Sequence, residues 1–254
     1  ENELECTLLD RVASGIELTE SGQRLYDYAN TVLSEYDKLK KEIDMIRASE
    51  EGTVELLVAY DILRYLTPDC ILEFQKKYPN VTFSYMEYPD RIVEKMLLDK
   101  EGNVALSIGP FAGDCFDMKS LKKCSLGLLV YEEHSLAKKR EATILDLEGE
   151  PLYLENSSFK LNEFIQSRCW NRGFEPDIVF ETNGFDLCYK MCRLKRGISV
   201  TIDFVHEDMN TEGLVMIPFA EDDMIWEIGL LTLKDRAMES SVEKFYKYIE
   251  NYNN

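Results

Sequence analysis

The stretch that decides the organisation of this chain is LTESGQRLYDYANTVLSEYDKLKKEIDMI, residues 18–46. From Leu25 onward its apolar side chains recur at alternating steps of four and three residues, at Leu25, Ala29, Val32, Tyr36, Leu39, Ile43 and Ile46. This spacing is the a/d repeat of a coiled coil, so it predicts a long helix that pairs with a copy of itself. Thr19 is the expected N-cap, and Gly52 is the expected end of the helix. The alternative is an ordinary amphipathic surface helix, whose apolar stripe is usually broader.

Two short segments precede this helix. Residues 1–10 place Leu4, Leu8 and Leu9 at helical spacing and are predicted to be the end of a helix. Residues 11–18 surround Gly15 and are predicted to be a short excursion of β type. We therefore expect only a small piece of structure ahead of the long helix.

After Gly52 the apolar pattern alternates between the periods of strands and helices. The expected strands are 54–58, 81–85, 104–108, 126–131, 151–154, 178–180, 198–202, 214–217 and 225–233. The expected helices are 68–78, 92–98, 161–170, 185–194 and 240–252. This alternation predicts α/β structure with mostly parallel strands. Because the pattern stops and restarts in mid-chain, it also predicts two lobes with a cleft between them.

The charge balance excludes one class of function for the chain as written. Its 254 residues contain 48 acidic and 29 basic side chains, a formal net charge of −19. A surface this acidic repels nucleic acid and anionic membranes over most of its area. No apolar run approaches the roughly 20 residues of a membrane span. The seven cysteines have no regular spacing and favour reduced thiols, so the expected location is the cytoplasm.

The residue patterns of common catalytic and metal sites do not occur in the sequence. His134 and His206 have no partners at zinc-ligand spacing, and both are expected to be solvated. Cys188 and Cys192 could share a metal ion or form a redox pair, but four-residue spacing on a helix is more often core packing. Nucleophile-elbow, Walker and dinucleotide-binding motifs are not found. The sequence therefore supports no enzyme activity, and we expect no cofactor and no bound metal.

The cleft between the lobes is the expected binding site for a small molecule. In open α/β sheets, ligands bind beyond the carboxyl ends of the strands, where helix N-termini offer free N–H groups. The residues expected to bind this molecule are Ala59, Tyr60, Asp61, Ile62, Gly109, Phe111, Tyr131, Asn156, Ser157, Ser158, Phe159, Thr182, Asn183, Thr201 and Asp203. For residues 156–159, NSSF, a simple N-cap is the equal alternative to a ligand role.

Several segments together resemble the LysR-type transcriptional regulators. ENELECTLLDR (1–11) and GIELTESGQRLYDYANTVL (15–33) resemble the wing and linker-helix signature of that family. Further similar segments are GTVELLVA (52–59), RYLTPDCILEFQKKYPNV (64–81), GNVALSI (102–108), EEHSLAKKR (132–140), ILDLEGEPLYL (144–154) and RGISVTI (196–202). The resemblance covers nearly the whole chain, and its specificity lies in the combination of segments.

This resemblance implies a ligand-responsive regulator built from three parts. Residues 1–18 would be a remnant of a winged helix-turn-helix, most of which would be missing from this chain, with Arg11 and Ser14 as contacts to the DNA backbone. Residues 19–51 would be the linker helix that forms a homodimer or homotetramer. Residues 52–254 would be an effector-binding domain like a periplasmic binding protein. Lobe 1 would comprise 52–130 and 225–254 and lobe 2 would comprise 131–224, with crossings near Tyr131 and Ile225.

Departures from the family pattern bear on the kind of effector. Family members that bind carboxylates tend to have Ser or Thr after the first strand, where this chain has Ala59 and Asp61. An Asp at a helix start repels an anion and can cap the helix itself. We therefore expect an effector that is neutral or cationic, or one that binds mainly through Ser157 and Ser158.

Three other interpretations are open at this point. A stand-alone solute-binding protein would have the same two lobes, but the coiled-coil helix and the absence of an export signal count against it. An enzyme on the same lobes would need a catalytic constellation that the sequence does not supply. A redox-sensing regulator that acts through Cys169, Cys188 and Cys192 is a variant of the favoured hypothesis.

Overall fold

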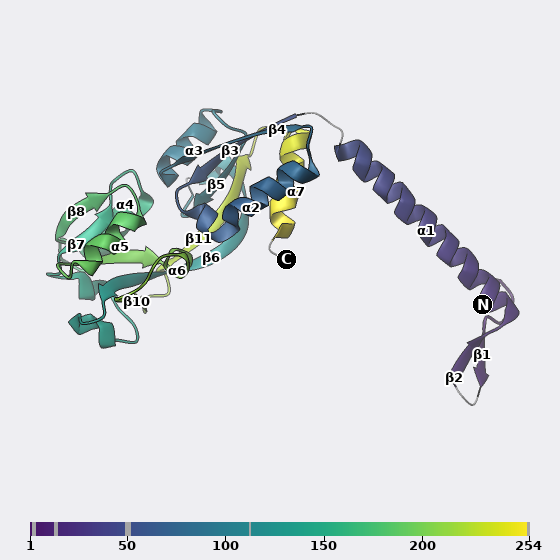
Figure 1. Cartoon of the computed structure of the whole chain (residues 1–254), viewed down its shortest axis with the longest axis horizontal. Helices are drawn as coiled ribbons and strands as arrows, with labels where there is room; N and C mark the ends of the chain where they lie inside the picture. The colour runs from purple at the N-terminus through teal and green to yellow at the C-terminus, as the bar shows by residue number, and fades with distance from the viewer. Residues whose placement is uncertain (2–3, 13–14, 49–51, 112, 253–254) are drawn as a thin grey trace. The chain divides into compact units, whose positions relative to one another are not determined.

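A computed structural model of the chain describes residues 1, 4–12, 15–48, 52–111 and 113–252; for residues 11, 12 and 41–48 it describes the backbone alone. The described residues fall into two compact units, Glu1–Glu50 and Glu51–Asn254 (Figure 1). The first unit contains the long helix, and the second contains all the α/β structure.

The first unit is a β-hairpin followed by the helix α1 (Glu20–Ala48). Strands β1 (Leu9–Val12) and β2 (Gly15–Leu18) pair antiparallel. Thr19 is the N-cap as predicted, because its hydroxyl accepts a hydrogen bond from the backbone N–H of Gly22 at 3.0 Å. A Cβ atom on Gly22 would lie 2.0 Å from the Leu8 carbonyl oxygen, so this close approach of the hairpin to the helix requires glycine.

The predicted helix over residues 1–10 is wrong. Residues 4–6 form a turn and a bend, and Leu9 begins a strand. The Glu1 carboxylate accepts hydrogen bonds from the backbone N–H groups of Leu8 and Leu9, at 2.7 and 3.2 Å. These bonds fold the segment back on Glu1 in a turn that leads into β1, which the helical spacing of the leucines does not reveal.

The apolar positions of α1 are uncovered in the single chain. Leu25, Val32, Tyr36 and Leu39 are 40%, 49%, 64% and 52% exposed. Ile43 and Ile46 lie in the helix, but their side chains are outside the described residues. Pairing of this helix with a second copy therefore stays a prediction, one that uncovered apolar side chains at a/d spacing support.

Lobe 1 of the second unit is a mixed five-stranded sheet in the order β4-β3-β5-β11-β6. The strands are β3 (Gly52–Ala59), β4 (Val81–Tyr88), β5 (Val104–Ile108), β6 (Phe116–Tyr131) and β11 (Ile225–Leu233). Its helices are α2 (Ile62–Lys77), α3 (Asp90–Leu98) and α7 (Ser240–Tyr252). β3 runs parallel to β4 and β5, whereas β11 is antiparallel to β5 and β6. Figure 1 shows α3 on one side of this sheet and α2 and α7 on the other.

Lobe 2 is built on the second half of β6, in the order β10-β6-β9-β7-β8. Its further strands are β7 (Leu152–Glu155), β8 (Ile178–Thr182), β9 (Ile198–Ile202) and β10 (Leu214–Pro218). Its helices are α4 (Lys160–Asn171), α5 (Phe185–Arg193) and α6 (Asp203–Asp208). Short 3-10 helices are η1 (Gly113–Cys115), η2 (Ser135–Lys138) and η3 (Ile144–Leu147).

The lobes are joined through β6, which changes its partner in mid-strand. Phe116–Ser125 pairs with β11 in lobe 1, and Leu126–Tyr131 pairs with β9 and β10 in lobe 2. The first crossing therefore lies between Ser125 and Leu126 rather than near Tyr131, because both halves belong to one continuous strand. The second crossing lies between the end of β10 and Ile225.

Helix α2 begins earlier than its sequence predicts. Pro68 is the expected start, but the helix starts at Ile62 and is interrupted at Thr67, with φ 59° and ψ 147°. The residue before a proline is disfavoured in the α conformation, so the interruption falls directly ahead of Pro68. The extra first turn carries Arg64 toward the cleft.

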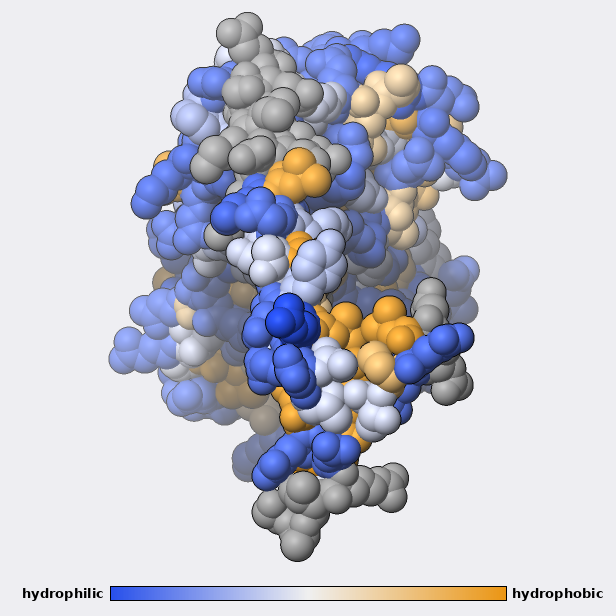
Figure 2. Space-filling view, turned by 90° about the vertical axis from the view of Figure 1, so that its right-hand side faces the viewer, coloured by the Kyte–Doolittle hydropathy of each residue, from blue (hydrophilic) through white to orange (hydrophobic). Residues whose placement is uncertain are grey.

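The surface carries many polar side chains, in keeping with the highly charged composition. The face in Figure 2 is largely hydrophilic, with smaller apolar patches between the polar side chains. Among the described residues, no helix is both long and apolar enough to span a membrane.

Candidate functional site: the cleft between the lobes

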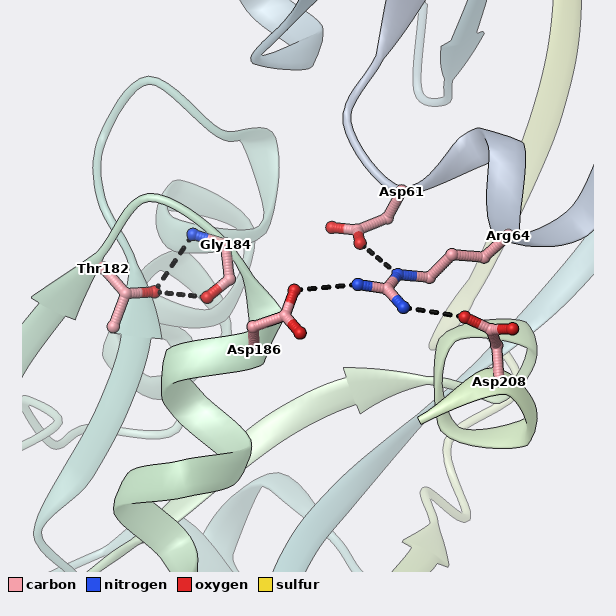
Figure 3. Close-up of polar contacts among 6 residues, drawn as sticks. All are labelled: Asp61, Arg64, Thr182, Gly184, Asp186 and Asp208. Carbon is pink, nitrogen blue, oxygen red and sulfur yellow. Dashed lines mark hydrogen bonds and ion pairs between the residues drawn. The ribbon is translucent and has the colours of Figure 1, made fainter. Parts of the chain in front are cut away.

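Arg64 on α2 ties the two lobes together at one mouth of the cleft (Figure 3). Its Nε donates to the Asp61 carboxylate of the same lobe. Its Nη2 lies 2.8 Å from Asp186 Oδ2 on α5, and its Nη1 lies 2.7 Å from Asp208 Oδ2 on α6. A planar guanidinium with donors on three nitrogens suits such a branched set of acceptors. One lobe 1 side chain therefore holds two separate elements of lobe 2.

The groove around Arg64 is acidic. It has a volume of about 480 Å³, and the acidic side chains Asp61, Glu87, Asp186 and Asp208 line it with Arg64 as the one basic residue among its lining residues. Burial raises the pKa of Asp61 above its ordinary value although Arg64 donates to it. Burial, followed by the charge of Asp61, raises the pKa of Glu87 as well. The groove therefore favours cations over anions.

Lys160 crosses the cleft at the opposite mouth. Its Nζ pairs with the Glu94 carboxylate and lies 2.6 Å from the carbonyl oxygen of Ile108, so a lobe 2 side chain enters lobe 1. Arg91 of α3 also pairs with Glu163 of α4. A second groove of about 480 Å³ lies between α3 and α4 beside these pairs. The two lobes are thus joined by ion pairs at both mouths of the cleft.

The N-terminus of α4 is already occupied by an acceptor from the other lobe. The backbone N–H of Lys160 donates to both carboxylate oxygens of Asp90, at 3.1 and 3.3 Å. The preceding N–H groups are used within the loop, since Ser158 donates to the Asn156 side chain and Phe159 to the Asn156 carbonyl. Within the predicted segment 156–159, Asn156 therefore takes the N–H groups of Ser158 and Phe159, and Asp90 takes the next N–H, that of Lys160. An anionic ligand would have to displace Asp90 to bind there.

The burial of Asp90 predicts a measurable pH dependence of stability. Burial raises its pKa to about 6 from 3.8, although Lys160 favours the carboxylate. An acid with a higher pKa in the folded chain binds more protons when folded, so it lowers stability as the pH rises through this window. We expect Asp90→Asn to reduce the fall in unfolding free energy between about pH 4 and pH 7 by on the order of 3 kcal/mol. Urea denaturation of both proteins measures this difference, and parallel pH curves would contradict it.

A small cavity of about 10 Å³ forms the floor of the cleft between the two mouths. Its walls come from both lobes and include the aromatic residues Tyr60, Phe159, Phe185 and Trp226. The rings of Tyr60 and Phe159 lie 6.1 Å apart between centroids. Glu155, at the end of β7, lines the same cavity and is 4% exposed. Burial, with smaller contributions from Asp61 and Asp90, raises the pKa of Glu155 well above its ordinary value.

Five of the residues predicted from the sequence line the floor or the acidic groove. They are Ala59, Tyr60, Asp61, Phe159 and Asn183. Asn183 and Asn156 join the loops after β8 and β7 through a side-chain hydrogen bond of 2.5 Å. The strand ends therefore meet at the cleft, as the α/β pattern predicts.

Four of the other predicted residues, Ile62, Thr182, Thr201 and Asp203, are buried or bonded within the fold. Ile62 and Thr201 are fully buried, and the Thr201 hydroxyl bonds Tyr189 at 3.0 Å. The Thr182 hydroxyl bonds both the N–H and the carbonyl of Gly184 (Figure 3). Asp203 accepts from the backbone of Ser125 and Phe204. Gly109, Phe111, Tyr131, Asn156, Ser157 and Ser158 line neither the floor nor the acidic groove.

The comparison with known proteins settles the family. Residues 47–253, most of the chain, match the family model of the LysR substrate-binding domain. The chain belongs to the LysR family. The two-lobed α/β fold class predicted from its sequence is confirmed, because effector-binding domains of this family have the same fold.

Relatives of this LysR chain are named as transcriptional regulators. GltC of Bacillus subtilis, a transcriptional dual regulator, is 24% identical over 251 residues, which cover 98% of this chain and 83% of GltC. YwbI of the same bacterium, an uncharacterised HTH-type transcriptional regulator, is 25% identical over 185 residues. That match covers 73% of this chain and less than two thirds, 62%, of YwbI. The structure of the BenM effector-binding domain with its effector benzoate has a TM-score of 0.67 at 18% identity, covering 80% of this chain and 92% of that domain.

Many of the residues of the LysR cleft that the sequence did not predict are charged. They include Arg64, Glu87, Asp90, Glu94, Glu155, Lys160, Asp186 and Asp208, and the unpredicted aromatic residues include Phe185 and Trp226. Glu155 alone had a usable signal, because it directly follows the predicted strand 151–154 and strand ends meet at the cleft. Of the others, Glu87 and Trp226 lie within the strands β4 and β11, and the rest lie on helices.

Both histidines of this LysR chain, and its cysteines Cys188 and Cys192, have structural surroundings. His134 is buried against Tyr131 rather than solvated, with its Nδ1 accepting from the Leu136 N–H at 3.3 Å. His206 bonds the Tyr189 hydroxyl through Nδ1 at 3.0 Å. Cys188 and Cys192 lie in the core, as the packing interpretation predicts. No group of three metal-ligating side chains occurs in the described part of the chain.

Proposed function

We propose that this chain is the effector-binding and dimer-forming part of a LysR-type transcriptional regulator that acts in the cytoplasm. An effector in the cleft changes the closure of the lobes, and the change repositions the linker helices of a homodimer or homotetramer. DNA-binding domains attached to those helices then bind operator DNA in a different arrangement. Effector binding and DNA binding are coupled in this way because both depend on whether the lobes are open or closed.

The observation that carries this proposal is the set of ion pairs across the cleft. Arg64 and Lys160 reach from one lobe to carboxylates of the other at opposite mouths. If only a few charged contacts keep the lobes closed, a ligand that competes for them can change the free-energy difference between the closed and open lobes by a few kcal/mol. Coupling free energies between two sites are typically of this size. The names of GltC and YwbI as transcriptional regulators support the same function and give no support to an enzyme.

The proposed effector is neutral or cationic. Four carboxylates surround the groove at Arg64, and Asp90 fills the helix N-terminus that would attract an anion. The BenM domain was solved with benzoate, a carboxylate, so this chain would differ from that protein in effector charge. Repulsion between an anion and these carboxylates, which outnumber the basic side chains that line the groove, is the physical reason.

Redox sensing is the alternative regulatory function, and the surroundings of the cysteines disfavour it. Cys169 and Cys188 are buried, and burial raises the pKa of each thiol to about 11. Reactive cysteines have lowered pKa values and exposed sulfur atoms. Alkylation of the native protein is therefore expected to leave these thiols unmodified and its oligomeric state unchanged.

A thermal-shift screen of the purified chain tests the effector proposal. The panel should hold amines, uncharged alcohols and sugars, and mono- and dicarboxylates, each at the same ionic strength because salt screens surface charges. We expect stabilisation to be confined to the cationic and neutral compounds, since ligands that bind only the folded state raise its stability. A response to simple dicarboxylates above that of the amines would contradict the proposal.

A further inference from the structure

Two polar side chains on the floor of the cleft have no hydrogen-bond partner among the described residues. The indole Nε1 of Trp226 is buried and unpaired. No described residue donates a hydrogen bond to the carboxylate of Glu155, whose surroundings contribute only burial and the charges of Asp61 and Asp90. Both residues are 4% exposed, and both line the same cavity. Buried polar groups are almost always paired, so an unpaired donor and an unpaired acid in one cavity point to a group that binds both.

The chemistry of the two side chains defines that group. A Trp N–H can only donate, so it requires an acceptor such as a hydroxyl or carbonyl oxygen. An ionised Glu155 requires donors, and the nearest charges that act on it, Asp61 and Asp90, are of the same sign. A cation next to Glu155 would be favoured by all three carboxylates together. A carboxylate there would be repelled by them.

The walls of the cavity add a second requirement. Tyr60, Phe159 and Phe185 join Trp226 to give four aromatic side chains around Glu155. Aromatic faces attract ammonium groups, and they pack against apolar or aromatic bodies of ligands. The cavity of about 10 Å³ holds a single small polar group in the closed lobes, and the rest of a ligand would lie toward the grooves.

We infer that Glu155 binds the primary ammonium group of the effector and that Trp226 donates to an adjacent hydroxyl or carbonyl oxygen, so that the effector is a small amine of the amino-alcohol or amino-amide class. This inference rests on the proposed effector function and narrows it from neutral or cationic to one chemical class. It assigns a specificity role to the carboxylate of Glu155, whereas the backbone carbonyl of the same residue serves the fold by accepting from Asn162.

A matched set of probes with one skeleton and three head groups tests this assignment. The probes are 2-amino-1-phenylethanol, 1-phenylethane-1,2-diol and mandelate, which carry an ammonium, a hydroxyl and a carboxylate in turn. The chain has two tryptophans, Trp170 and Trp226, so the two indole N–H signals of the ¹⁵N-labelled protein report on binding directly. Trp170 is 55% exposed, lines neither the floor nor the acidic groove, and serves as the internal reference.

We expect 2-amino-1-phenylethanol to shift the Trp226 signal saturably and to bind at least tenfold more tightly than mandelate or the diol. Glu155→Gln, which keeps the shape and removes the charge, should weaken binding of the amine at least tenfold, whereas Glu155→Asp should retain part of it. The melting temperature of Glu155→Gln should be no lower than that of the native chain, because it removes a buried unpaired acid. A merely structural Glu155 would instead lose stability.

Three results would overturn the inference. One is binding of mandelate or the diol as tight as that of the amine. Another is an unchanged affinity of the amine for Glu155→Gln. The third is a Trp226 signal that does not shift with any of the probes, even at the highest concentration at which each probe dissolves. That result would mean that Glu155 and Trp226 bind only water. A Trp226 response to mandelate that saturates at the same concentration as the response to the amine, or at a lower one, would reject the amine class while leaving the effector function intact. The absence of any stabilising compound in the thermal-shift screen would instead reject that function itself.

Discussion

Arg64→Met is expected to lower the free energy of unfolding of the α/β unit by about 2–3 kcal/mol, or its melting temperature by about 5–10 °C. The substitution leaves Asp61, Asp186 and Asp208 without the guanidinium that they share. Asp61 carries most of the cost, because its side chain is 10% exposed whereas those of Asp186 and Asp208 are 68% and 49% exposed. The loss should shrink as the pH falls toward the pKa of Asp61, which burial raises, since protonation removes the buried charge that Arg64 no longer pairs. Urea denaturation at several pH values measures it.

Two further variants separate this effect from a general loss of charge. Arg168→Met removes an arginine that pairs with one largely exposed carboxylate, Asp223, and should cost less than about 1 kcal/mol. Adding Asp61→Asn to Arg64→Met should restore at least half of the lost stability, because the buried charge is then gone. Equal losses in Arg64→Met and Arg168→Met would show that Arg64 does not hold the lobes together.

Val32→Asp is expected to weaken dimerisation at least 100-fold, which corresponds to about 3 kcal/mol. Val32 is at an a/d position of α1 and is 49% exposed in the single chain, so in a paired helix it would face its own copy. Two aspartates would then be buried opposite each other at the seam, at the cost of desolvation and repulsion. Sedimentation equilibrium over a range of protein concentrations measures the change in the dissociation constant.

Ser34→Asp is the matched control for this prediction. It adds the same charge to the same helix, at an exposed position off the a/d repeat. Both variants carry the same helix-propensity penalty of Asp, so a difference between them reports on the seam alone. If both variants dimerise like the native chain, or if both fail equally, the pairing of α1 through its apolar repeat is wrong.

Periodic segments could be predicted from the sequence because their own residues carry the signal. β9 (Ile198–Ile202) and α7 (Ser240–Tyr252) have the bounds that their apolar patterns predict. The first half of β6 did not follow this rule. Its residues 116–125, FDMKSLKKCS, are largely polar and partly exposed, and the strand forms because β11 supplies hydrogen-bond partners along its length.

The cleft could be placed from the sequence, but its charges could not. Arg64 meets Asp186 and Asp208 across 122 and 144 residues of sequence, and Asp90 meets the Lys160 N–H across 70. The sequence does not show which charged side chains of a helix have a distant partner, because most charged side chains on helices lie on a solvated surface. Asp61 was the exception. Its place at a helix start, directly after a buried strand, predicted an acidic site, and Arg64 and its partners extend that site across the cleft.

The most direct test of the account is a crystal structure of this chain with the compound that stabilises it most in the thermal-shift screen. The account predicts density for that compound between the lobes, in contact with Tyr60 and Phe159, and ion pairs of Arg64 that differ from those of the free chain. Density elsewhere on the surface, with the ion pairs of the cleft unchanged, would contradict it.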